Sequence, residues 1–84
     1  MKLKTEVVES LKREFKVCTS AIEYYQKMRG EMEKKHGISS LKFMKKFEDG
    51  QMGDDQDFFD WYAYNRFVDS WQKTRMAIEE LVVT

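Results

Sequence analysis

The sequence predicts an all-α fold, namely an antiparallel hairpin of two long helices joined through a short connecting helix. Three observations predict it. The 84 residues contain no proline, and apolar side chains recur three or four positions apart over long stretches. No useful length of the chain alternates apolar and polar residues, as a strand does. The length suits a single helical domain over residues 1–84.

The first long helix is predicted over residues 4–35. Lys34 and Lys35 match the negative end of a helix dipole, and Gly37 suits the C-terminal cap. One apolar stripe runs along this helix. It consists of Val8, Leu11, Phe15, Cys18, Ile22, Tyr25, Met28 and Met32.

A short helix is predicted over residues 40–48, because Ser39 or Ser40 suits its N-terminal cap and the dipeptide Asp49-Gly50 ends it. Its apolar face is expected to be Leu41, Met44 and Phe47, which are spaced three residues apart. The lysines of this segment lie mostly outside that face.

The last helix is predicted over residues 55–81, after an acidic segment whose carboxylates can accept free backbone N–H groups. Seven aromatic residues lie between Phe58 and Trp71, more than one partner helix can cover. Surface of this kind marks a protein partner, so we expect docking onto another protein or dimerisation into a bundle. The expected apolar stripe is Phe58, Trp61, Val68, Trp71, Ile78 and Leu81.

The charge is divided between the two halves of the chain. Residues 1–48 carry 12 Lys or Arg against 7 Glu, a net +5, and residues 49–84 carry 3 basic against 8 acidic residues, a net −5. The halves can attract each other in an antiparallel fold, or present two faces to two partners. No block of Lys and Arg reaches the density of a nucleic-acid-binding arm.

Several classes of protein are disfavoured by composition. The longest apolar runs are two or three residues, too short for a membrane span. The N-terminus has no apolar signal-peptide core, and a single cysteine, Cys18, cannot form an internal disulfide. We therefore expect a cytoplasmic protein. Cys18 lies within the apolar stripe, which favours a small buried side chain over a nucleophile.

No cofactor, metal site or catalytic activity is expected. The aspartates after residue 48 do not have the spacing of an EF-hand loop, and helix capping accounts for Asp54, Asp55 and Asp57 without a ligand. His36 has no second His or Cys at ligand spacing, so it is interpreted as a cation at a helix C-terminus or a surface residue. The chain has no phosphate-binding glycine loop and no Ser-His-Asp set.

Residues 43–62 carry a recognisable phrase, F-x-x-K-[YF]-x-x-G-x-x-x-D-D-x-D-x-F-x-W-[YW]. Its positions here are Phe43, Lys46, Phe47, Gly50, Asp54, Asp55, Asp57, Phe59, Trp61 and Tyr62. With a charged helix before it and a second helix after it, this phrase resembles a family of short prokaryotic antitoxins. The resemblance implies a partner encoded beside this chain, often a ribonuclease-type toxin, which is neutralised by direct binding. The chain lacks an evident ribbon-helix-helix or helix-turn-helix segment, a departure from many antitoxins.

The leading hypothesis is therefore a non-enzymatic interaction protein. Aromatic side chains dominate binding hot spots, and carboxylates could meet a basic surface on the toxin. The candidate partner-binding residues are Phe43, Phe47, Phe58, Phe59, Trp61, Tyr62, Asp54, Asp55, Asp57 and Asp60. One alternative is a homodimeric helical scaffold or adaptor without a toxin partner, forming a four-helix bundle. A weaker one is a nucleic-acid accessory protein using the basic first helix with Lys42, Lys45 and Lys46.

Overall fold

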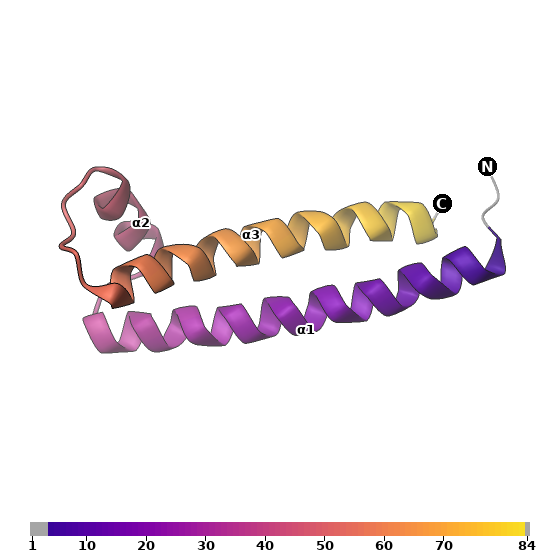
Figure 1. Cartoon of the computed structure of the whole chain (residues 1–84), viewed down its shortest axis with the longest axis horizontal. Coiled ribbons are helices and arrows are strands. Elements are labelled where there is room, and N and C mark those ends of the chain that lie inside the picture. Colours follow the sequence, from indigo (N-terminus) through magenta and orange to yellow (C-terminus); the bar gives the residue numbers. More distant parts are fainter. Residues whose placement is uncertain (1–3, 84) are drawn as a thin grey trace.

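The computed structural model describes residues 4–83 as three helices, α1 (Thr5–His36), α2 (Ser40–Glu48) and α3 (Gln56–Val83). Figure 1 shows α1 and α3 side by side and antiparallel, with α2 beside the start of α3 at the end where the chain turns back. We call this the closed end of the hairpin, and the end with the two chain termini the open end. The all-α hairpin predicted from the sequence is confirmed. No described helix is long and apolar enough to cross a membrane.

The helix boundaries follow local capping chemistry. α1 ends at Gly37, whose φ of 70° is the left-handed conformation that glycine adopts without strain, and its N–H bonds the carbonyl of Glu33. The Ser39 hydroxyl accepts from the N–H of Lys42 and caps α2. Gly50, with a φ of 71°, follows the end of α2. Asp55 lies just before α3 and not inside it, and its carboxylate accepts from the N–H of Asp57 at 2.9 Å.

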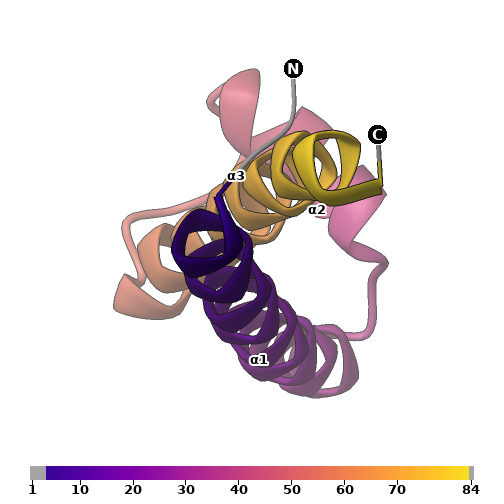
Figure 2. The same ribbon diagram turned by 90° about the vertical axis from the view of Figure 1, so that its right-hand side faces the viewer.

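The seam between α1 and α3 holds most of the core, with seven-residue spacing on both helices as in an antiparallel coiled coil. Viewed along the long axis, α1 and α3 cross each other, and α2 lies behind α3, on the side away from α1 (Figure 2). The apolar side chains buried among the described residues are Cys18, Ile22, Phe43, Trp61, Val68 and Ile78. Burial of Cys18, with 1% exposed, confirms its interpretation as a small core residue.

Two sequence predictions about the apolar faces are wrong. In α2 the buried residues are Ser40 and Phe43, whereas Leu41, placed on the inner face by its spacing, is 79% exposed. This nine-residue helix has two possible apolar stripes. The stripe containing Phe43 and Phe47 faces the core because aromatic rings of α3 pack against it. Leu81, expected in the stripe of the last helix, is 54% exposed.

Candidate functional site: the closed end of the hairpin

All six aromatic residues predicted to bind a partner come together at the closed end. We call Phe43, Phe47, Phe58, Phe59, Trp61 and Tyr62 the aromatic cluster. The rings of Phe43 and Trp61 stack in parallel with centroids 3.9 Å apart and planes 4° apart. The ring centroid of Phe58 lies 6.0 Å from that of Phe43, and the ring centroid of Phe47 lies 5.5 Å from that of Phe43. The cluster therefore joins α2 to the first two turns of α3.

The centre of the aromatic cluster is core. Phe43 and Trp61 are both 0% exposed, so in this conformation neither ring can face a partner. The expectation that these two residues are partner anchors does not hold for the folded chain. They were selected because aromatic rings at a helical junction have the same sequence pattern whether they pack inward or outward, and here each covers the other.

A buried polar chain fixes the position of Trp61. Its indole Nε1–H donates to the Ser40 hydroxyl at 2.9 Å, and the Ser40 backbone N–H donates to a carboxylate oxygen of Glu33 at 2.7 Å. Since Ser40 is the first residue of α2, its N–H has no partner within the helix. One serine thus links all three helices. The sequence gives no signal for this contact, because Ser40 and Trp61 are 21 residues apart.

The outer part of the cluster reaches the surface. Phe59 is 49% exposed, and its ring meets Phe47 edge to face at 5.6 Å. Tyr62 is partly buried and stacks on Phe47 at 4.8 Å. Phe47 thus contacts both of these rings. We call Phe59 and Tyr62, together with the neighbouring carboxylates of Asp54, Asp55 and Asp60, the rim of the closed end.

The predicted acidic residues have different roles. Asp55 caps α3 as expected, and Asp60 accepts from the Gln56 amide at 2.9 Å. Asp57 bonds both Lys35 and His36 at the end of α1. These bonds lower the pKa of Asp57, first through Lys35 and then through His36, and the same contact raises the pKa of Lys35. Asp57 therefore fastens α3 to α1, whereas Asp54 and Asp55 remain exposed.

His36 is a further part of this junction. Its Nε2 lies 3.1 Å from the Asp57 carboxylate, and its ring lies against Phe58 at 5.1 Å and Trp61 at 5.6 Å. Position 36 was interpreted as a helix C-terminal cation or a surface residue. It does end α1, but its side chain is only 20% exposed because the aromatic cluster covers it.

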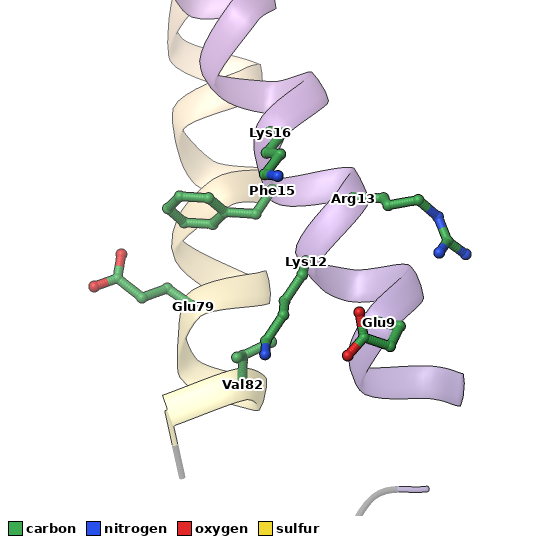
Figure 3. A pocket seen from close by; sticks show the side chains of 7 residues that line it. All are labelled: Glu9, Lys12, Arg13, Phe15, Lys16, Glu79 and Val82. Atoms are coloured by element: carbon green, nitrogen blue, oxygen red, sulfur yellow. The ribbon is translucent and has the colours of Figure 1, made fainter. Parts of the chain in front are cut away.

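The open end has a shallow groove of about 510 Å³ between α1 and α3. Phe15 and Val82 provide apolar lining, while Glu9, Lys12, Arg13, Lys16 and Glu79 surround them (Figure 3). Arg13 points away from the other labelled side chains in that view. The guanidinium of Arg75 lies 5.8 Å from the Phe15 ring centre. Charges of both signs line this groove, so it has no single electrostatic preference.

Among residues 4–83, no three His, Cys, Asp or Glu side chains are grouped so that they could hold a metal ion. Comparisons of the chain with protein-family models, with curated proteins and with solved structures find no match.

Proposed function

We propose that this chain is a non-enzymatic protein-binding module that neutralises a neighbouring ribonuclease-type toxin by direct binding, in the cytoplasm. The resemblance to short antitoxins supplies the class of partner. The exposed ring of Phe59, held against Phe47 near the start of α3, is the observation that carries the proposal. Aromatic side chains that are already ordered lose little entropy on binding and serve well as anchors.

The rim also has a charge suited to that partner. Asp54 and Asp55 lie directly before α3 and are exposed, and Asp60 follows Phe59 on the first turns of the helix. Carboxylates near an apolar anchor favour a basic partner surface, because complementary charges raise the association rate and exclude wrong partners. An RNA-cleaving toxin has such a surface where it holds the phosphate backbone.

The test is a growth assay with the product of the gene beside that of this chain. We expect that product to arrest growth when expressed alone and the wild-type chain to restore growth. Phe59→Lys combined with Tyr62→Ala should abolish rescue and weaken binding at least about 100-fold, without loss of helical circular dichroism. Met76→Lys, at a residue 61% exposed and away from the rim, is the matched control and should still rescue. A harmless neighbour, or rescue by the rim variant, would refute the proposal.

A homodimeric scaffold without a toxin partner is the second candidate, and the extended shape of the chain favours it. The radius of gyration is 16.5 Å, against about 12 Å for a compact domain of this length. A chain that self-associates tightly and binds no product of a neighbouring gene would support this alternative. Dimerisation alone does not distinguish the two, since one chain can use different surfaces for each contact.

A further inference from the structure

The hairpin exposes more surface than its mass requires. Its accessible area is 6417 Å², whereas a compact monomer of 10.1 kDa exposes about 5,300 Å². The excess of roughly 1,100 Å² is close to the area, about 800 Å² per partner, that each subunit buries in a standard protein interface. The excess surface of this elongated chain is thus large enough to supply one contact of ordinary size.

The exposed apolar side chains are not scattered. Eight large apolar residues are exposed within the described part of the chain. Five of them lie on two neighbouring rows of side chains along α1 and on the corresponding two rows along α3: Val7, Val17, Tyr24, Phe67 and Leu81. On α1 the rows are positions 7, 10, 14, 17, 21, 24, 28 and 31, spaced three and four apart. On α3 they are positions 56, 60, 63, 67, 70, 74, 77 and 81. We call these sixteen positions the flat face.

The two sets of rows lie on one side of the seam. Tyr25 connects them, because its ring contacts Tyr24 at 5.1 Å and Phe67 at 4.9 Å. The groove at the open end is lined from the other side of each helix, by Lys12, Lys16 and Glu79 among others. Ser40, at the start of α2, bonds Glu33 and Trp61 on that other side as well. The short helix therefore leaves the flat face uncovered.

The composition of the flat face is that of an interface centre. None of its sixteen positions is Lys or Arg, although these make up 15 of the 84 residues. Small residues at 21, 63, 70 and 77 separate the larger apolar side chains and permit close approach of another helix. Its only charged residues are Glu14, Glu31 and Asp60. Interface centres are depleted in lysine and enriched in aromatic residues in this way.

On both helices, basic residues occupy positions that directly precede flat-face positions and border the face: Arg13, Lys27, Arg66 and Lys73. Arg13 reaches the edge of the face, where its guanidinium donates to the Ser10 hydroxyl at 3.1 Å. The face thus has an apolar centre, a few carboxylates and a border whose basic residues outnumber the two acidic ones in the same rows of seven-residue spacing, Glu6 and Glu80. Two such faces laid together bring the carboxylates of one near the cations bordering the other, so the surface is complementary to a copy of itself.

We propose that a second copy of this chain docks on the flat face and that the two hairpins form a four-helix bundle. The two-fold symmetry of such a dimer makes each apolar row meet the corresponding rows of the partner. The exposed apolar residues extend from Val7 and Leu81 at the open end to Tyr24 and Phe67 near the middle of the two helices, so the contact is centred on that part of the hairpin. Of the rim, only Asp60 belongs to the flat face. Phe59, Tyr62, Asp54 and Asp55 are not flat-face positions, and the dimer presents two copies of each.

Sedimentation equilibrium on the whole chain, from about 1 to 100 µM, tests the dimer. We expect a dimer for the wild type and a monomer for Tyr24→Lys combined with Phe67→Lys, with a dissociation constant raised at least about 100-fold. Leu41→Lys combined with Met76→Lys is the matched control, since both residues are exposed and off the face, and it should remain dimeric.

Circular dichroism must show that each variant keeps its helices. If the first pair disturbs the Tyr25 contacts, Val17→Lys with Leu81→Lys tests the same face and should also give a monomer. A wild type that stays monomeric at 100 µM overturns the proposal. So does a dimer that survives both face variants, or one that only the control variant dissociates. Rescue of growth by the variant with Phe59→Lys and Tyr62→Ala, with its dimer intact, would refute the rim instead and leave the dimer standing.

Discussion

The closed and open ends of the hairpin use the same two helices but differ in how they are held. At the closed end, Phe43 and Trp61 are fully enclosed, and a serine connects three helices. At the open end, a groove separates parts of α1 and α3, and the apolar residues lining it, Phe15 and Val82, are only partly buried. The short helix explains the difference, since it provides a third packing surface at one end only.

The proposed function follows the same division. A surface that must present ordered side chains to a partner benefits from a rigid support, and the rim rests directly on the aromatic cluster. The open end has no such support. We therefore expect the stability of the chain to be concentrated near α2, and substitutions to have a decreasing effect with distance from it.

The largest effect is expected from Trp61→Ala. It removes the largest fully buried side chain of the described residues and leaves the Ser40 hydroxyl without its donor, so the loss of unfolding free energy should be about 3–5 kcal/mol. That is a large share of the stability of a domain of this size. Urea denaturation followed by circular dichroism measures it. A loss below about 1 kcal/mol would show that the cluster does not hold the closed end.

Ser40→Ala should cost less, about 1–3 kcal/mol, because the buried indole N–H then lacks an acceptor. The backbone bond from residue 40 to Glu33 remains, since it does not need the side chain. A double-mutant cycle with Trp61→Phe isolates the hydrogen bond. If the two changes are additive, the contact contributes nothing of its own.

Val82→Ala at the open end is expected to cost under about 1 kcal/mol, because its side chain is partly exposed beside the groove and little new cavity is formed. Val68→Ala, at a residue 3% exposed in the same helix, is the matched comparison and should cost more. Equal losses in thermal melts of the two variants would remove the distinction between the ends.

The smallest effect concerns pH. The pKa of Asp57 is lowered in the folded chain by its bonds to Lys35 and His36, so its contribution is complete above the pKa of the unfolded chain and is lost as pH falls below about 4. The pKa of Lys35 is raised by Asp57, so that contribution is lost as pH rises through the folded value. Asp57→Asn should therefore flatten the pH dependence of stability at both extremes. Unchanged denaturation profiles at acid and alkaline pH would contradict the pairing.

Much of the fold could be predicted from the sequence because it depends on local rules. The stripe of α1, the glycine at position 37 and the cap of α2 are each encoded within a few residues. The inner face of α2 could not be predicted, since Leu41 and Phe43 fit a helical stripe equally well until α3 is present. Trp61 was predicted both in the apolar stripe of the last helix and among the partner-binding residues; the sequence could not decide between the two, because its partners, Phe43 and Ser40, are distant in the sequence.

Native-state hydrogen exchange across α1 and α3 tests the central claim most directly, since exchange rates report local opening. We predict the slowest amides in residues 22–36 and 58–70, near the aromatic cluster, and exchange faster by at least about tenfold in residues 5–12 and 76–83. Uniform protection along both helices, or slower exchange at the open end, would contradict the claim that the closed end holds the fold and supports the rim.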